Sequence, residues 1–238
     1  IVDEGKNISG SINNRTILAQ ANYVGATDSS GVKVINKGNI NYTGNKSTAL
    51  AVDFAQATNE KNATIKMSGD NSIGLYGAAN SFLNNKGTIE VGKAGVGIWG
   101  ANSISKRWTN ENISIVNFGT IKGISGKEGV FGIYANNTSK EKTTTSTVNH
   151  TGKIDLSESD KSTGILLQKG SLTSSGNISI KDESVGVNAI NSSVTISGGN
   201  YKSVNKSTIF RIKGIGSKIL GSSGDILLTG KDSIVYLL

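Results

Sequence analysis

A short phrase of a polar residue, a glycine and an isoleucine recurs along the chain with a nearly constant period. It reads Asn85–Ile89, Asn117–Ile121, His150–Ile154 and Ser174–Ile178. The isoleucine, taken as a first anchor, defines a column of mostly apolar positions: Ile40, Ile65, Ile89, Ile121, Ile154, Ile178, Tyr201 and Ile226. Successive members lie 25, 24, 32, 33, 24, 23 and 25 residues apart. A period of this size indicates a stacked repeat protein.

A second apolar position, often preceded by glycine, comes 9 to 12 residues after each first anchor. These second anchors form another column: Leu50, Leu75, Ile98, Ile133, Ile165, Val187, Phe210 and Val235. The two long periods both arise between a second anchor and the next first anchor. They predict insertions of about eight residues at the same corner of two consecutive repeats, at 101–113 and 135–147.

Around the first anchor the pattern has period 2, which is the period of a β-strand. Even offsets are apolar or small and predict an inward face. An apolar column lies six residues before the anchor: Val34, Leu83, Ile115, Val148, Leu172 and Leu220. A polar column lies four residues before it: Asn36, Asn85, Asn117, His150, Ser174, Ser197 and Ser222. A glycine column lies two residues before it: Gly38, Gly87, Gly119, Gly152, Gly176, Gly199 and Gly224. Odd offsets are mostly polar and predict an outward face.

These patterns predict an all-β chain that forms one right-handed parallel β-helix of about eight coils, each of about 24 residues. A single coil cannot bury its own apolar face, and stacking the coils buries a continuous core. The glycine column fits a corner that needs either a positive φ or a close backbone approach. The Asn and Ser column beside it predicts hydrogen bonds between coils. Residues 1–31 fit less well, and Gly10–Ile12 is the expected opening of one more coil.

The composition excludes several kinds of functional site. The chain of 238 residues has no cysteine and one histidine, which excludes a disulfide framework and thiolate metal sites and argues against a histidine-based catalytic triad. The net charge is +8, but the lysines are scattered and only three residues are arginine, so we expect no nucleic-acid partner. A diffuse positive field favours attraction to anionic cell surfaces.

No signal peptide opens the chain, and no apolar run reaches the roughly 18 residues of a membrane helix, so we expect no membrane contact by these residues. We expect that the sequence is a fragment of a longer protein, cut at both ends. We expect a monomer without cofactor or metal.

The phrase Asn85–Ile89, followed by Gly95–Asn102, resembles the passenger repeats of large type V autotransporters, notably the fusobacterial adhesins. The resemblance covers residues 32–238. It implies a β-helical passenger displayed at the cell surface and exported across the outer membrane, and such adhesins attach to host cells or to other bacteria. The family has no shared catalytic motif.

An aromatic residue follows the second anchor in three consecutive repeats: Tyr76, Trp99 and Tyr134. If the anchors point inward, these rings point outward. We expect Gly74, Gly97 and Gly132 on the same outer face, so that rings and bare backbone together form a flat surface for sugars or an aromatic partner. The alternative is a column of rings stacked on one another or covered by the insertions. The first insertion carries Arg107 and Trp108, which are residue types enriched at binding interfaces.

The charged residues Lys66, Glu90, Lys122 and Asp155 alternate in sign at one outward position. We interpret them as a surface ladder of ion pairs. Glu90 and Asp155 are also a conceivable pair of carboxylates for polysaccharide cleavage, but Lys122 between them would keep both ionised, which does not suit a general acid.

His150 lies in the inward polar column and is expected to be a structural residue. The sequence therefore predicts a non-enzymatic adhesin passenger that attaches to a cell-surface protein or glycan. The alternatives are a purely structural stalk that holds a binding tip elsewhere and, less favoured, a β-helical polysaccharide-acting enzyme.

Overall fold

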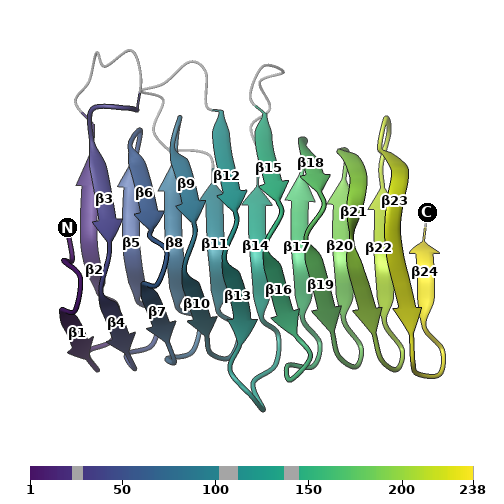
Figure 1. The fold of residues 1–238 in the computed structure, drawn as a ribbon, viewed down its shortest axis with the longest axis horizontal. Coiled ribbons are helices and arrows are strands. Elements are labelled where there is room, and N and C mark those ends of the chain that lie inside the picture. The colour runs from purple at the N-terminus through teal and green to yellow at the C-terminus, as the bar shows by residue number, and fades with distance from the viewer. Residues whose placement is uncertain (23–28, 102–111, 137–144, 238) are drawn as a thin grey trace.

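The computed structural model describes residues 1–22, 29–101, 112–136 and 145–237, and every regular element among them is a β-strand. The chain winds through nine coils that lie side by side in sequence order from the N-terminus to the C-terminus (Figure 1). A typical coil contributes three strands, one to each of three faces. Among the described residues no helix is long and apolar enough to cross a membrane.

The first face carries the first anchors. Its strands are β1 (Asn7–Gly10), β4 (Asn39–Tyr42), β7 (Thr64–Met67), β10 (Thr88–Val91), β13 (Thr120–Gly123), β16 (Lys153–Leu156) and β19 (Asn177–Ile180).

The second face is a nine-stranded parallel sheet that carries the second anchors. Its strands are β2 (Thr16–Ala21), β5 (Thr48–Asp53), β8 (Ile73–Ala78), β11 (Val96–Ala101), β14 (Phe131–Asn136), β17 (Thr163–Gln168), β20 (Val185–Ile190), β22 (Thr208–Lys213) and β24 (Ile234–Leu237).

The third face consists of β3 (Lys33–Asn36), β6 (Gln56–Asn59), β9 (Phe82–Asn85), β12 (Ile113–Asn117), β15 (Ser146–His150) and β18 (Gly170–Ser174). In the last two coils one long strand crosses from the third face to the first: β21 (Ser193–Ser203) and β23 (Lys218–Leu228). These two strands join the faces into a single 15-stranded sheet.

The parallel β-helix inferred from the repeats is confirmed by the register of the first face. Every neighbouring pair of first anchors is paired, from Ile40 opposite Ile65 through Ile89 opposite Ile121. The two insertions therefore leave the register of the first anchors unchanged, as the sequence predicted.

The second anchors pair in the same way from Leu50 to Phe210, with one correction at the end. Phe210 pairs with Tyr236, so the assignment of Val235 to this column is wrong by one residue. The rings of Phe210 and Tyr236 stack with centroids 5.5 Å apart. Val235 takes the position that the buried Ile209 holds before Phe210, and it too packs against the core. Two consecutive inward positions in an apolar run such as Ile234–Leu237 give no alternation that would fix the choice.

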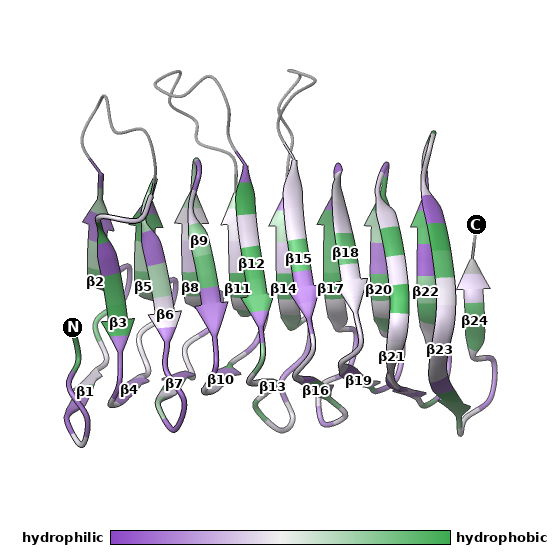
Figure 2. Cartoon of the chain, turned by 45° about the horizontal axis from the view of Figure 1, so that its top comes forward, coloured by the Kyte–Doolittle hydropathy of each residue, from purple (hydrophilic) through white to green (hydrophobic). Residues whose placement is uncertain are grey.

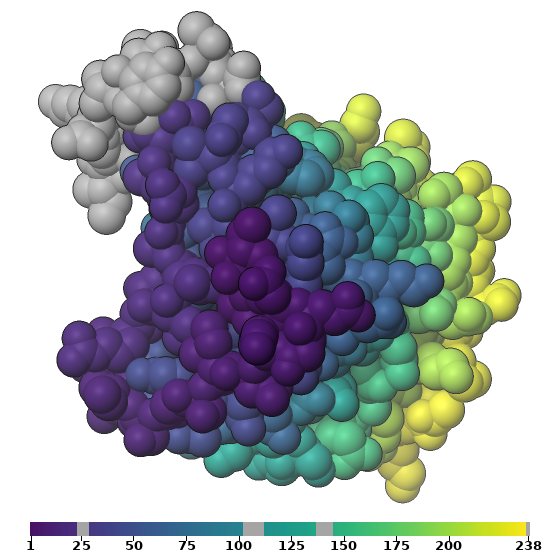
Figure 3. Space-filling model, turned by 60° about the vertical axis from the view of Figure 1, so that its left-hand side comes forward, coloured from purple at the N-terminus to yellow at the C-terminus, as the bar shows by residue number. Residues whose placement is uncertain are grey.

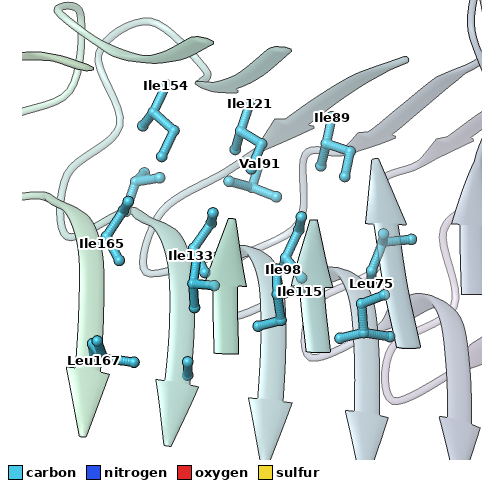
Figure 4. Packing of buried hydrophobic residues seen from close by; sticks show 14 of the residues in the cluster. Leu75, Ile89, Val91, Ile98, Ile115, Ile121, Ile133, Ile154, Ile165 and Leu167 are labelled. Carbon is cyan, nitrogen blue, oxygen red and sulfur yellow. The ribbon is translucent and has the colours of Figure 1, made fainter. Parts of the chain in front are cut away.

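The core is a stack of isoleucine, leucine and valine side chains from all three faces. First anchors such as Ile89 and Ile121 face second anchors such as Ile98 and Ile133 across the interior (Figure 4). All four are fully buried. Apolar and polar residues form alternating bands along the strands (Figure 2). Apolar members such as Ile89 and Val91 are buried. Burial of such side chains contributes about 1.5–3 kcal/mol each and is the main stabilisation of the fold.

A hydrogen-bonded ladder of fully buried side chains runs parallel to the core, as the Asn and Ser column predicted. Each amide donates to the next: Asn36 to Asn59 at 2.9 Å, Asn59 to Asn85 at 2.9 Å, and Asn85 to Asn117 at 2.8 Å. Asn117 then donates to Nδ1 of His150 at 3.1 Å. The sequence analysis did not assign Asn59 to the ladder, because in its coil the ladder residue precedes the first anchor Ile65 by more than four residues.

Near the C-terminus two columns were assigned wrongly. Ser174 pairs with Ile196, so Ile196 and not Ser197 continues the ladder column. Val194 pairs with Ile219, so Ile219 and not Leu220 continues the apolar column. The cause is one additional residue in β21 relative to the preceding coil, between Ile196, which pairs with Ser174, and Tyr201, which pairs with Ile178. Strand β23 repeats this longer spacing, since Val194 pairs with Ile219 and Tyr201 with Ile226. An additional residue in a strand exchanges its two faces beyond that point.

The glycine column is explained by close approach more than by positive φ. An added Cβ on Gly119 would lie 2.1 Å from the carbonyl oxygen of Gly87, and only Gly199 and Gly224 of this column have positive φ. The left-handed corner lies elsewhere, before each strand of the second face. It is occupied mostly by other residue types: Asn14, Lys46, Asn71, Ala94, Gly129, Lys161, Glu183, Lys206 and Asp232.

Strands β1, β2 and β3 form a coil at the N-terminal end, which Figure 3 shows in purple facing the viewer. β1 pairs with β4 and β2 pairs with β5. The residue aligned with the first anchors is Ile8, opposite Ile40. The expected opening at Gly10–Ile12 therefore lies too late in the chain, and Ile12 is exposed.

Candidate functional site

The three candidate aromatic residues lie on the outer surface of the second face, one per coil. Trp99 pairs with Tyr76 on one side and with Tyr134 on the other. The rings of Trp99 and Tyr134 stack, with centroids 5.6 Å apart and an angle of 9° between their planes. Tyr76 meets Trp99 with centroids 5.6 Å apart and an angle of 85°. All three side chains are half-buried, so the column is self-stacked and still accessible.

Apolar residues extend this surface beyond the three rings. Phe131 stacks against Tyr134 from the same strand, with centroids 5.8 Å apart. Leu166 continues the column after Tyr134, and Ala51 and Ala19 precede Tyr76. We call the outer surface of β2, β5, β8, β11, β14 and β17 the aromatic face. The indole Nε1 of Trp99 is shielded from solvent and has no hydrogen-bond partner among the residues that the structure describes.

The glycine strip does not belong to the aromatic face, which corrects the expectation from the sequence. Gly74, Gly97 and Gly132 are buried and point into the core. A Cβ on Gly97 would lie 2.4 Å from Cγ2 of Ile121 and 2.6 Å from the carbonyl oxygen of Gly132. In these strands two consecutive residues, the glycine and the second anchor, both face inward. This break in the alternation is what a strict period of 2 failed to predict.

The two predicted insertions lie largely outside the described residues. Arg107 and Trp108 fall between residues 102 and 111, so their place relative to the aromatic face stays a prediction. The described ends of these segments are the strand end at Ala101 and the strand end at Asn136, which pair with one another on neighbouring coils.

An open hollow of about 380 Å³ lies at the N-terminal end of the aromatic face, beside Tyr76. Ala19 and Ala51 form its floor, because alanine occupies in these two coils the column that carries a ring in the next three. Gln20 and Asp53 also line it. Burial raises the pKa of Tyr76 above its usual value, and the nearby Asp53 carboxylate adds to the rise, so the phenol stays protonated. Sequence reasoning missed this site, since its walls come from three coils.

The charged ladder is a set of ion pairs. Glu90 binds both neighbours, Lys122 at 2.9 Å and Lys66 at 3.6 Å. Asp155 pairs with Lys153 of its own strand at 2.6 Å and accepts a hydrogen bond from the Ser157 hydroxyl at 2.6 Å. Burial opposes these contacts, yet the pKa of Asp155 is lowered by them, so its carboxyl is a poor proton donor. Among the described residues no group of three or more acidic or histidine side chains gathers as a metal would require.

His150 is fully buried within the ladder. Its Nδ1 accepts from Asn117 and its Nε2 donates to the carbonyl oxygen of Asn177 at 3.3 Å. Burial lowers the pKa of His150 from 6.5 to about 4, although the backbone groups of Asn177 and Asn117 act in the opposite direction. A side chain held neutral and shielded from solvent is a structural member of the ladder, as the sequence indicated.

Nine stacked coils of parallel strands with a polar ladder inside define a parallel β-helix. The family model described as the BigA third pectate lyase-like domain matches residues 3–200, and the chain belongs to this family. BigA is an autotransporter-type adhesin, and the match does not single out the fusobacterial adhesins. No curated protein and no solved structure gives a significant match.

Proposed function

We propose that this domain belongs to a passenger displayed at the cell surface that attaches to host or bacterial cells, and that the aromatic face is its contact surface. The observation that carries the proposal is the column of Tyr76, Trp99 and Tyr134, half-buried on a flat parallel sheet. Tyrosine and tryptophan supply large contact areas with little loss of conformational freedom, which is why they are enriched at binding surfaces. Export across the outer membrane and likeness to the fusobacterial type belong to the same proposal.

We further propose that the domain is not an enzyme. Glu90 and Asp155 are each paired with a lysine, and the lowered pKa of Asp155 makes its carboxyl a poor general acid. His150 is enclosed in the core and cannot reach a substrate. The chain acts as a monomer in this proposal, without a cofactor or metal.

A purely structural stalk is the second candidate. The unbroken Asn ladder and the continuous core favour it, since both stiffen a rod without creating a binding surface. The two functions differ in one respect that an experiment can measure: a stalk does not bind cells through its own surface.

The test is attachment of the purified chain to epithelial cells and to bacteria, measured by flow cytometry with a labelled protein. The Trp99→Ala variant opens the ring column, and the Phe118→Ala variant is the matched control, because Phe118 is an exposed aromatic residue outside the aromatic face. We expect the first variant to lose attachment and the second to retain it, with both keeping the circular dichroism of the parent. Attachment by both variants at the level of the parent would place the contact outside the aromatic face, and no attachment by the parent favours the stalk.

A further inference from the structure

The second face changes its charge along the rod. No residue of β8, β11, β14, β17 or β20 is charged. On the next strand, β22, Arg211 and Lys213 both point outward. Resting on the proposed function, we infer that this face binds an apolar segment of a cell-surface protein that carries acidic residues at one end.

The uncharged part of the face is apolar on its outside as well as on its inside. Beside the rings of Tyr76, Trp99 and Tyr134, the same strands begin with Ile73, Val96 and Phe131. The first face differs, since its outward column carries paired charges. Parallel sheets that are apolar on both sides are normally covered on both sides, and an exposed patch of this kind marks a contact surface.

The arrangement of the rings favours a protein over a glycan. Trp99 and Tyr134 stack on each other with centroids 5.6 Å apart, and Phe131 stacks on Tyr134 at 5.8 Å. Each of these three rings therefore has a face packed against a neighbour. Sugars pack on ring faces, whereas apolar side chains of a protein also pack against ring edges. The indole Nε1 of Trp99 is shielded, so it does not offer a donor to a sugar hydroxyl.

The basic end of the face has no internal counter-charge. Neither Arg211 nor Lys213 has an ion-pair partner in the described part of the chain. The flanking strands β20 and β24 contain no acidic residue. The acidic residues Glu183 and Asp232 lie in the corners before these strands, beside two lysines. The two positive charges are therefore complementary to acidic groups of a partner.

The apolar and basic parts are continuous, because the strands of the second face lie side by side from β8 to β22 (Figure 1). Leu166, Asn188 and Arg211 continue the column of Tyr134 on the next three strands. With strands about 4.8 Å apart, Arg211 lies roughly 14 Å from Tyr134 along the rod, which about four extended residues span. The partner segment therefore runs along the rod, with its acidic end over β22.

The size of the patch favours a segment over a second copy of the chain. The outer surface of β8, β11, β14 and β17 measures roughly 400 Å², from four strands of six residues each. A stable protein interface needs about 800 Å² from each partner. A short segment fills the smaller area, and its charged end adds specificity.

The first test compares attachment of the complete 238-residue chain to untreated cells, to trypsin-treated cells and to cells whose glycans are oxidised with periodate. We expect trypsin to abolish attachment and periodate to leave it intact. Raising the salt concentration should weaken attachment severalfold without abolishing it, because only the charged end is screened. Attachment that survives trypsin, loss of attachment after periodate, or binding to phosphatidylserine vesicles overturns the inference.

A second measurement needs no cells. A random-peptide library displayed on phage is selected on the chain, and we expect enriched peptides to combine an apolar stretch with Asp or Glu at one end. Enrichment of basic peptides, or of peptides without charge, overturns the inference.

A pair of charge-reversed variants locates the acidic end. Arg211→Glu with Lys213→Glu should weaken binding of the enriched peptides by about tenfold. Lys37→Glu with Lys61→Glu is the matched control, because it changes the net charge equally at exposed positions between the third and first faces. This control should bind as the parent does, and both should keep the circular dichroism of the parent. Equal losses in the two double variants would assign the attraction to net charge and overturn the site.

Failure of this inference is distinguishable from failure of the proposed function. If Trp99→Ala abolishes attachment to cells but reversal of Arg211 and Lys213 does not, the acidic segment is refuted and attachment through the aromatic face stands. If the chain binds acidic-ended apolar peptides through Trp99 and Arg211 but attaches to no cells, attachment is refuted and the peptide site stands.

Discussion

The central coils and the last two coils of the rod are built from the same sequence repeat, yet they differ in how firmly the repeat fixes the structure. In the central coils the first anchor Ile121 is fully buried, whereas Ile226, in the same column of the last coil, is 40% exposed. The difference does not lie in the residue type. An anchor is buried only when coils cover it on both sides, so burial in a solenoid is a property of stacking.

The polar ladder shows the same contrast. Between Asn36 and His150 each member donates to the next through a buried side chain. Beyond it, Ser174 bonds to the hydroxyl of Tyr201 at 2.9 Å, and Ile196 takes the ladder position. The ladder therefore ends where the register becomes irregular. Comparing equivalent substitutions in the two regions separates the effect of stacking from that of residue type.

The largest effect is expected from placing a carboxylate in the anchor column. Ile121→Asp should destabilise the fold by about 4 kcal/mol or more, because an unpaired charge would be buried between coils. Ile226→Asp should cost about 1 kcal/mol, since solvent reaches that side chain. Lys122→Asp is the outward control and should cost less than Ile121→Asp. Urea unfolding followed by circular dichroism measures all three, and equal losses at Ile121 and Ile226 would contradict the dependence on stacking.

The ladder itself is tested by Asn85→Ala. This change leaves the Asn59 donor and the Asn117 acceptor without their partners, and should cost about 3 kcal/mol of unfolding free energy. Ser197→Ala is the comparison in the irregular region. Its hydroxyl is on an exposed residue and makes one long hydrogen bond of 3.4 Å, so the expected loss is below about 1 kcal/mol. A similar loss for both variants would mean that the ladder does not stabilise the central coils.

Acid should weaken the central coils through His150. Its pKa is about 4 in the folded chain against 6.5 ordinarily, so its contribution to stability is complete above pH 6.5 and is lost as the pH falls toward 4. Protonation would place a second donor opposite the Asn117 amide, which cannot turn because its oxygen accepts from Asn85. Between pH 7 and pH 5 the loss is about 2 kcal/mol. His150→Asn keeps a ladder side chain and should remove that part of the pH dependence in urea unfolding.

The smallest effect is expected at the glycines. Gly97→Ala forces a methyl group against Ile121 and the Gly132 carbonyl, which should cost about 1 kcal/mol or somewhat more. Gly221 has open space around it and no positive φ, so Gly221→Ala should be neutral or slightly stabilising. Thermal unfolding measures both. A destabilised Gly221→Ala with an unaffected Gly97→Ala would reverse the assignment of crowded and open positions.

Much of the fold could be predicted because the repeat is serial. Errors in one coil are corrected by the next, so Ile40 through Ile178 were aligned despite two insertions. Prediction failed for Ser197, Leu220 and Val235, which lie in the last two coils. One added residue exchanges the faces of a strand there, and too few coils follow to reveal the shift.

The candidate site could be predicted only in part. The position directly after the second anchor predicted the aromatic column of Tyr76, Trp99 and Tyr134 and its outward direction. The glycines beside them were placed on the wrong face, because a strand with two consecutive inward residues breaks the period of 2. The hollow at Ala19, Ala51 and Asp53 gave no signal, since small residues in two coils form a hollow only beside the large residue of a third.

The sequence by itself determined the parallel β-helix, the anchor columns and the buried polar ladder, because each depends on a pattern repeated in every coil. The tertiary structure alone decided which way the ring of Tyr76 turns, which carboxylates are paired with lysine, and where the surface is hollow. These features arise from contacts between different side chains on neighbouring coils. A repeat specifies what its units share, whereas a binding surface is made by the positions at which they differ.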